Sequence, residues 1–306
     1  MMSLWQRLPV VVRALLAGLA VSLAGITPWG GIAGYSGLAG WNLRLLVKVP
    51  WAIAPMALYL WLYFRYLNGA GWPRSTAATR RVSLRANSLS GDLWAMSLVA
   101  GFIGLAALIP LTSIMGRLFT LPVEAQPIDV PAGMPFITTF LLLVMSSIIA
   151  GVVEESAFRG YMQGPIERRH GFVVAILVSG VMFGLGHFNH HPAAVLEMLP
   201  FYVGVAAIYG GLAYATNSIL PGIVLHAGGD IWSLTRLWTT GQADWQLTPA
   251  SPALIWQTGV DAAFVMSVVA FAVLGAAAAW AYAGVARAAR AESASHVFTT
   301  PVSQRR

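Results

Sequence analysis

Apolar segments recur along the whole chain, and they constrain its fold more than any other feature. The first run covers residues 14–26, and others follow at about 48–66, 93–116, 134–157, 171–188, 196–214, 219–236 and 259–285. A helix of roughly 20 apolar residues spans the hydrocarbon core of a bilayer. Backbone groups in lipid have no water to bond, so they must be satisfied within helices or closed barrels. The pattern predicts an all-α, polytopic transmembrane helical bundle with about eight spans.

The composition supports this prediction and excludes several kinds of site. Charged residues make up 9% of the chain and hydrophobic residues 58%, whereas soluble domains carry about 25% charged residues. The chain has no cysteine, which excludes disulfides, thiolate metal sites and a cysteine nucleophile. Any metal ion must be held by His, Asp, Glu or water.

The basic residues predict how the bundle is oriented. They cluster in alternate connections and in the C-terminal tail: Arg65, Arg74, Arg80, Arg81 and Arg85, then Arg159, Arg168 and Arg169, then Arg287, Arg290, Arg305 and Arg306. Cytoplasmic loops carry the excess of Lys and Arg, so we expect these segments and both termini to be cytoplasmic. Only Arg44 and Lys48 depart from the pattern. This rule accounts for the net charge of +7, so we expect no nucleic-acid partner.

Four segments follow from the pattern of spans. Residues 1–133 hold three N-terminal spans and a basic cytoplasmic loop, and residues 134–236 hold four spans with the polar residues described below. Residues 237–287 form an outer loop and the last span, and residues 288–306 a disordered basic tail. The first apolar run also resembles a signal peptide cleaved near Ala24. We interpret it as an uncleaved helix, because eight spans fit the distribution of charge.

Few ionisable side chains fall within apolar segments, where each costs about 2.5–3.5 kcal/mol at a helix centre. They are Glu154, Glu155, Arg159, His187, His226 and Asp230. Singly, each is compatible with a structural hydrogen bond or ion pair, and the carboxylate pair with a proton relay of a transporter. Their occurrence together at helical spacings favours one polar site.

Helical spacing predicts which of these side chains meet. Residues four apart share a helix face, so Arg159 is expected to pair with Glu155. Glu154 points about 100° away and is the freer carboxylate, suited to act as a general base. His226 and Asp230 are also four apart and together can hold a water molecule or a metal ion.

The set Glu154, His187, His226 and Asp230 is typical of a water-activating hydrolase. The residues leave two alternatives open, a Zn²⁺ ion held by these four side chains or a water molecule held without metal. Depth is an obstacle, since His187 lies about 24 Å from the start of its predicted helix. For His187 to approach Glu154, the helices must be tilted, or the helix that carries Glu154 (the Glu helix) must be long and displaced from the simple spans.

Three motifs carry a resemblance to a known family. Residues 154–160 read EESAFRG, matching EExxxR; residues 183–187 read FGLGH, matching FxxxH; residues 226–230 read HAGGD, matching Hxxx(N/D). The chain is similar over residues 134–236 to the CPBP group of intramembrane proteases, which includes CAAX proteases and bacteriocin-processing (Abi) proteins. The resemblance implies a helical bundle with its site in a membrane cavity, and endoproteolysis of peptides or lipid-modified C-termini.

The resemblance also implies roles for the residues. Glu154 would activate water with His187, while His226 and Asp230 would position the water or stabilise the oxyanion. Glu155 and Arg159 would be the supporting pair. Asp230 stands where many members have Asn, and an ionised carboxylate cannot donate a hydrogen bond.

The predicted function is therefore an intramembrane endopeptidase in a bacterial cytoplasmic membrane. Its substrate would be a membrane-associated peptide or a protein C-terminus. Two other functions remain open: a non-catalytic adaptor or bacteriocin-immunity protein of the same fold, and a proton-coupled transporter that uses the Glu pair as its relay.

Overall fold

The computed structural model describes residues 4–26, 37–121, 128–188, 194–242 and 253–299. Within these residues the chain is helical, and its only strand-like feature is an isolated bridge between Ala86 and Ser218. The elements in chain order are α1 Leu4–Arg7, α2 Val10–Ile26, α3 Gly37–Arg44, α4 Ile53–Leu67, the 3-10 turn η1 Arg74–Thr76, α5 Ala77–Leu84, α6 Gly91–Leu118, α7 Phe136–Glu154, the π-helix η2 Glu155–Gln163, α8 Gly164–His170, α9 Phe172–Gly186, α10 Val195–Thr216, α11 Leu220–Thr240, α12 Ile255–Thr258 and α13 Ala262–Thr299.

Each predicted apolar segment contains a helix, so the all-α prediction is confirmed. In the described part of the chain, four helices are long and apolar enough to cross a membrane by length and composition: Gly91–Leu118, Phe136–His170, Val195–Thr216 and Ala262–Ala294. Helices α2 and α9 are apolar but shorter. The chain is therefore a helical membrane protein.

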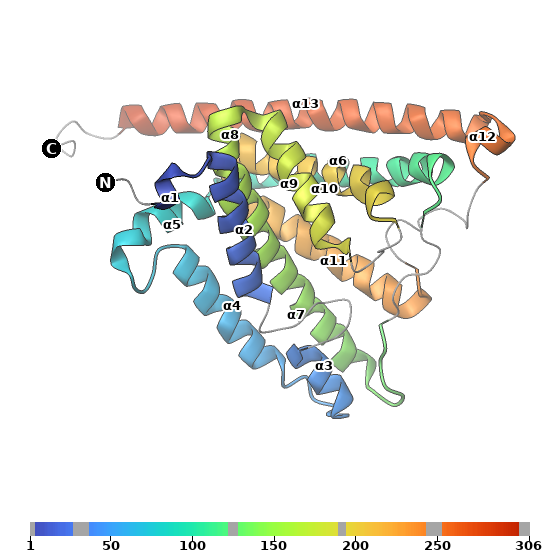
Figure 1. Ribbon diagram of the computed structural model, residues 1–306, viewed down its shortest axis with the longest axis horizontal. Coiled ribbons are helices and arrows are strands. Elements are labelled where there is room, and N and C mark those ends of the chain that lie inside the picture. Colours follow the sequence, from blue (N-terminus) through green and yellow to red (C-terminus); the bar gives the residue numbers. More distant parts are fainter. Residues whose placement is uncertain (1–3, 27–36, 122–127, 189–193, 243–252, 300–306) are drawn as a thin grey trace.

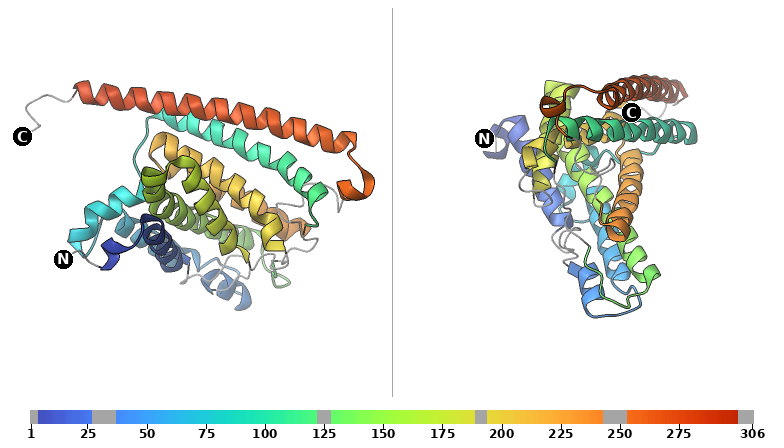
Figure 2. Two further views of the ribbon diagram at one scale, coloured as in Figure 1. Left: turned by 45° about the horizontal axis from the view of Figure 1, so that its top comes forward. Right: turned by 90° about the vertical axis from the view of Figure 1, so that its right-hand side faces the viewer.

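The helix that carries Glu154 runs through the middle of the molecule (Figure 1). Helices α2 and α11 pack against it, and α9 packs against α10. Helix α13 lies along α6 at one side of the bundle (Figures 1 and 2). Only 6% of its apolar window is buried, so most of its apolar surface is available to lipid. The polar residues are enclosed by η2, α9, α10 and α11.

The Glu helix is continuous over 35 residues, from Phe136 to His170, because η2 joins α7 to α8 without a break. The Gly164–Pro165 pair does not interrupt this helix. Proline lacks the N–H that an α-helical bond needs and crowds the carbonyl four residues earlier. The wider π turn, with bonds from residue i to i+5, ends at Gln163, and Pro165 falls in the first turn of α8, where the missing N–H needs no partner.

Helix α13 reaches Thr299, so the predicted disordered tail is helical from residue 288 to that point. The physical reason is composition, because residues 276–291 are mostly Ala with Arg, both strong helix formers. Residues 300–306 lie outside the described part of the chain.

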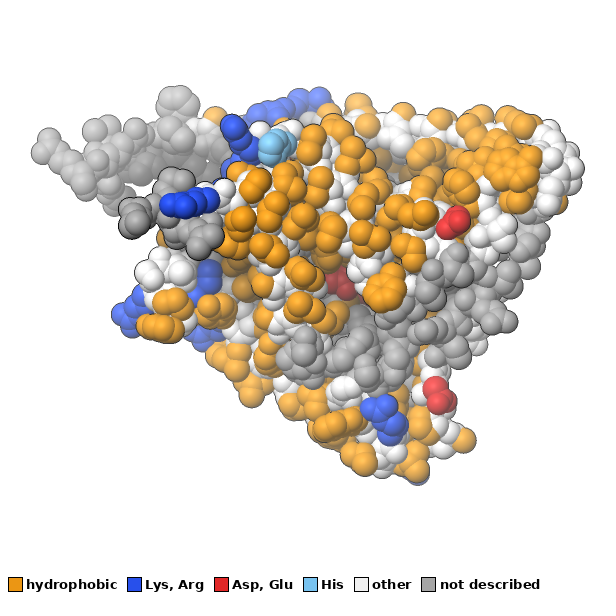
Figure 3. Space-filling view, viewed as in Figure 1, with side chains coloured by type: hydrophobic (Ala, Val, Ile, Leu, Met, Phe, Trp, Pro, Cys, Tyr) orange, Lys and Arg blue, Asp and Glu red, His pale blue; other side chains and the backbone are white. Residues whose placement is uncertain are grey.

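The Arg-rich connections lie toward one end of the bundle. Figure 3 shows most visible Lys and Arg side chains in the left half of the view, where α1, α5 and α8 lie, and a further cationic group over α3. Arg65, Arg74, Arg81, Arg168 and Arg169 are exposed there. The arrangement agrees with the separation of charge that the sequence predicts.

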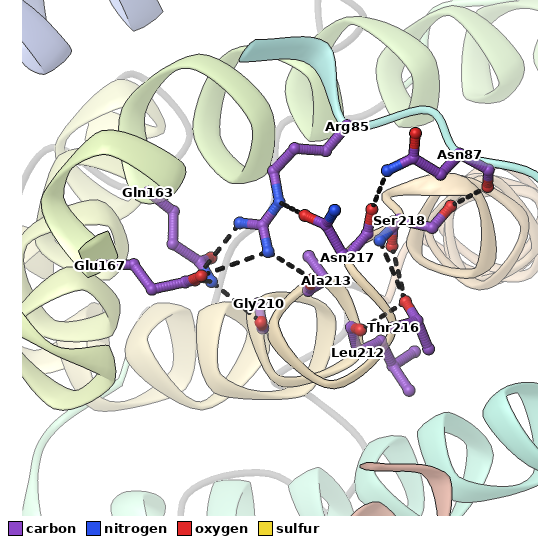
Figure 4. Close-up of polar contacts among 10 residues, drawn as sticks. All are labelled: Arg85, Asn87, Gln163, Glu167, Gly210, Leu212, Ala213, Thr216, Asn217 and Ser218. Carbon is purple, nitrogen blue, oxygen red and sulfur yellow. Dashed lines mark hydrogen bonds and ion pairs between the residues drawn. The ribbon is translucent and has the colours of Figure 1, made fainter. Parts of the chain in front are cut away.

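Not all of the predicted loop arginines face solvent. Arg80 and Arg85 are buried, and Arg159 is fully buried within η2. Figure 4 shows Arg85 donating to Glu167, to the Asn217 side chain and to the Ala213 carbonyl. Carbonyl and carboxylate oxygens accept hydrogen bonds from Arg80 and Arg85, whereas Arg159 forms the ion pair with Glu155 that helical spacing predicts.

Candidate active site

The predicted pair of Glu155 and Arg159 is confirmed. The Arg159 Nη1 atom lies 3.2 Å from Glu155 Oε1, and both side chains have 0% exposure. The guanidinium also lies 4.7 Å from the ring centroid of Phe183 and 5.4 Å from that of Tyr209. A buried unpaired charge is strongly unfavourable, so the carboxylate and the ring faces together make this guanidinium tolerable.

Glu155 also holds His226. The Nδ1 atom of His226 lies 2.9 Å from Glu155 Oε1, so one carboxylate oxygen contacts both Arg159 and the imidazole. A carboxylate at one ring nitrogen fixes the orientation of an imidazole. Helix α11 leaves room for this carboxylate at Gly222, where an added Cβ would lie 2.9 Å from Glu155 Oε2.

Glu154 lies on the other side of the same imidazole. Its Oε2 atom is 3.6 Å from His226 Nε2 and 4.0 Å from His187 Nε2, while Asp230 Oδ2 is 3.7 Å from His226 Nε2. The structure thus brings all four residues of the predicted hydrolase set together. Side-chain exposure rises from 7% for His226 and 10% for Glu154 to 20% for His187 and 30% for Asp230. The cluster is therefore most accessible at Asp230.

The hydrogen bond of His187 assigns its tautomer. Its Nδ1 atom lies 2.8 Å from the Phe183 carbonyl oxygen. A carbonyl oxygen only accepts, so Nδ1 carries the hydrogen and Nε2 of the neutral ring is an acceptor. That acceptor faces Glu154. A water molecule between them can donate to Nε2 and to the carboxylate at once.

The depth obstacle is removed by the length of the Glu helix. Helix α9 ends at Gly186, and His187 is its C-terminal cap residue. Because the Glu helix spans 35 residues, Glu154 lies deep enough in the bundle to meet the far end of α9. This is the second of the two arrangements that the sequence permits, a long Glu helix.

Sequence reasoning missed the aromatic side chains around the imidazoles. Tyr202 is stacked on His187, with ring centroids 4.9 Å apart and planes 28° apart. Tyr209 is stacked on His226 at 5.1 Å and 12°. The edge of Phe183 meets both imidazoles. The spacing of seven residues between the tyrosines, two helical turns, is the signal that could have found them.

The donor set of the site bears on whether it could hold a metal ion. Among the described residues, no three or more His, Asp or Glu side chains form a group that could hold a metal ion. The Nδ1 atom of each imidazole is bonded within the protein, that of His226 to Glu155 and that of His187 to the Phe183 carbonyl. Both Nε2 atoms therefore face Glu154. Glu154, His187, His226 and Asp230 are the side chains that would hold a Zn²⁺ ion if one were bound.

Comparison with protein families agrees with this geometry. Residues 136–232 match the family model described as "Type II CAAX prenyl endopeptidase Rce1-like". The matched segment runs from the start of α7 into α11 and contains all six candidate residues. A search of curated proteins and a search of solved structures gave no match for this chain.

These findings define the class of protein as a helical membrane protein with a segment that matches a protease family. Within that class, residues 136–232 are similar to the Rce1-like type of CAAX prenyl endopeptidase. The predicted resemblance to CAAX proteases is confirmed for this segment, which is less than half of the chain.

Proposed function

We propose that this protein is an intramembrane endopeptidase in which Glu154 activates a water molecule for attack on a peptide bond. The observation that carries the proposal is the convergence of three groups. Glu154 Oε2 lies 3.6 Å and 4.0 Å from the Nε2 atoms of His226 and His187. These separations are longer than hydrogen bonds and match groups that share a water molecule.

Glu154 accepts a proton from that water as its oxygen attacks the carbonyl carbon of the scissile bond. His187 Nε2 accepts the second hydrogen bond of the water and orients it. The attack converts the carbonyl oxygen to an oxyanion. When the tetrahedral intermediate collapses, the C–N bond breaks and Glu154 returns the proton to the leaving nitrogen, which gives one new carboxyl and one new amino terminus.

His226 is the group suited to stabilise the oxyanion. Its Nδ1–H donates to Glu155, and in the protonated ring Nε2–H donates as well. Asp230 lies 3.7 Å from Nε2 and supports the protonated ring by its charge. The Asp230 carboxylate therefore assists the His226 Nε2–H donor without donating a hydrogen bond itself. Arg159 balances the charge of Glu155.

The substrate we propose is a peptide or protein C-terminus that is associated with the membrane. The apolar faces of the bundle, above all that of α13, suit a bilayer, and the Arg-rich end suits the cytoplasmic side of a bacterial cell membrane. A lipid-modified C-terminus is one such substrate, and a precursor peptide is another.

The test compares purified wild type with Glu154→Gln and His187→Ala on fluorogenic C-terminal and precursor peptides, together with the metal content of each sample. We expect cleavage by the wild type and none by Glu154→Gln, with unchanged folding. Bound zinc at one equivalent, lost in His187→Ala, would replace the metal-free step with a metal-assisted one. Full activity of Glu154→Gln in cells would instead favour a non-catalytic adaptor.

A further inference from the structure

Helix α10 supplies no reacting group in the proposed mechanism, yet it touches both imidazoles. Tyr202 is stacked on His187 and Tyr209 on His226. The two histidines come from the end of α9 and from α11, which are separate elements. Helix α10 thus places a stacked tyrosine ring on each of them.

The placement of these tyrosines follows from helical geometry. Seven residues correspond to about two turns and about 10.5 Å of rise, so both rings project from one face of α10. Both side chains are buried, with exposures of 5% and 4%.

Neighbouring glycines let the helices approach closely enough for stacking. A Cβ added at Gly184 of α9 would lie 3.2 Å from Tyr202 Cβ, and a Cβ added at Gly222 of α11 would lie 3.7 Å from Tyr209 Cβ. On the opposite side of α10, the Gln163 amide donates to the Gly210 carbonyl at 2.9 Å. The turn that bears Tyr209 is therefore fixed to η2.

An imidazole held at one nitrogen can still swing out of the plane that its reaction requires. His187 has its Nδ1 bond to the Phe183 carbonyl, and His226 has its Nδ1 bond to Glu155. A stacked ring on one face and the edge of Phe183 on another remove this freedom. Aromatic pairs of this kind contribute about 0.5–1.5 kcal/mol beyond the area they bury.

We infer that Tyr202 and Tyr209 are positioning residues that hold the two imidazoles in their reactive orientation. The inference rests on the proposed function, since it assigns the tyrosines to the same site. Their ring faces carry the role. The positioning acts on the histidines and not on the substrate.

The experiment replaces each tyrosine by Leu and by Phe and measures peptide cleavage. We expect kcat of Tyr202→Leu and Tyr209→Leu to fall by about 10- to 100-fold, with KM close to that of the wild type. The Phe variants retain the ring and should recover most of kcat. The matched control is Tyr214→Leu, on the same helix but 53% exposed and in contact with Phe172, which should leave kcat unchanged.

A second measurement is independent of turnover. Nuclear magnetic resonance of histidine-labelled protein reports the ring-current shift of His187 and His226. Each shift should disappear in the corresponding Leu variant and persist in the Phe variant. Equal kcat for the Leu variants and the wild type would overturn the inference, as would Phe variants as inactive as the Leu variants. If the wild type cleaves no peptide, the proposed function fails. The spectra test the positioning separately, because unchanged imidazole spectra in the Leu variants would refute it.

Discussion

Two buried polar clusters lie along the same helix, and they differ in the distances between their polar groups. Around Arg85, the guanidinium donates at 2.6–3.3 Å to a carbonyl, an amide and a carboxylate, and Gln163 donates to the same carboxylate (Figure 4). Around Glu154, the two imidazole nitrogens lie 3.6 Å and 4.0 Å from the carboxylate. The groups of the first cluster bond directly to one another, whereas the Glu154 carboxylate and the two imidazoles lie at distances that a shared water molecule can bridge.

The difference separates a structural cluster from a reactive one. A network of direct hydrogen bonds between buried groups rigidifies a fold. A site that transfers protons needs a carboxylate within reach of water. Variants in the Arg85 cluster should therefore change stability, and variants in the Glu154 cluster should change turnover.

The largest expected effect is that of Glu154→Gln on turnover. Gln has nearly the same shape but cannot accept a proton from water, so kcat should fall by about 10²–10⁴-fold. Because the substitution removes a buried charge without changing volume, the thermal midpoint in detergent should stay close to that of the wild type. If Glu154→Gln instead unfolded, and its remaining folded fraction cleaved the peptide normally, Glu154 would have a structural role.

Arg85→Ala should have the converse effect. It leaves Glu167 buried without its partner, and breaking a buried ion pair costs about 3–5 kcal/mol. The measurement is unfolding in detergent, with kcat determined per folded molecule. The matched control is Arg81→Ala, an exposed arginine with one long bond to the Asn68 carbonyl, which should change stability little. Loss of kcat in folded Arg85→Ala would remove the distinction between the clusters.

The sequence predicted the reactive cluster better than the structural one, and for a physical reason. Glu155 and Arg159 meet because four-residue spacing places them on one helix face, and His226 and Asp230 meet by the same rule. The contact of Arg85 with Glu167 joins residues 82 positions apart, and no local periodicity reports it.

The same limit applies to the fold. Apolar segments located the helices, but the continuity of the Glu helix through Pro165 depends on the π turn η2, which sequence spacing does not indicate. The aromatic partners of the histidines also depend on how α10 packs between α9 and α11. Local pattern therefore predicts helices and pairs within a helix, whereas contacts between helices require the packed structure.

A smaller effect is expected where the two helices of the reactive cluster touch. Gly222→Ala places a Cβ 2.9 Å from Glu155 Oε2, which pushes this carboxylate away from His226. We expect kcat to fall by about 10- to 100-fold, as for other groups that orient a reacting histidine. Gly228→Ala is the control, since no described atom lies within 4 Å of its added Cβ. It should keep full kcat, and its stability should rise by up to about 1 kcal/mol; equal kcat in both variants would argue against a role for Glu155.

The smallest expected effect is that of an exposed ion pair, and it is compared with the effect of Arg85→Ala in the buried cluster. Arg117 Nη1 lies 2.7 Å from Asp261 Oδ2, and the Asp261 side chain is 50% exposed. The pKa of Asp261 is lowered from its usual 3.8, chiefly by the backbone N–H of Phe264 and then by the bond from Arg117. A lowered pKa in the folded state means stabilisation that is present above the unfolded pKa and lost as the pH falls through the folded one.

Asp261→Asn should therefore lower the thermal midpoint slightly at neutral pH, and far less than Arg85→Ala does. The gap from the wild type should close in acid below pH 3.8, and kcat should not change. If the difference in thermal midpoint between the variant and the wild type stayed constant with pH, the Asp261 charge would not stabilise the start of α13. The exposed ion pair would then contribute no stability, unlike the buried one.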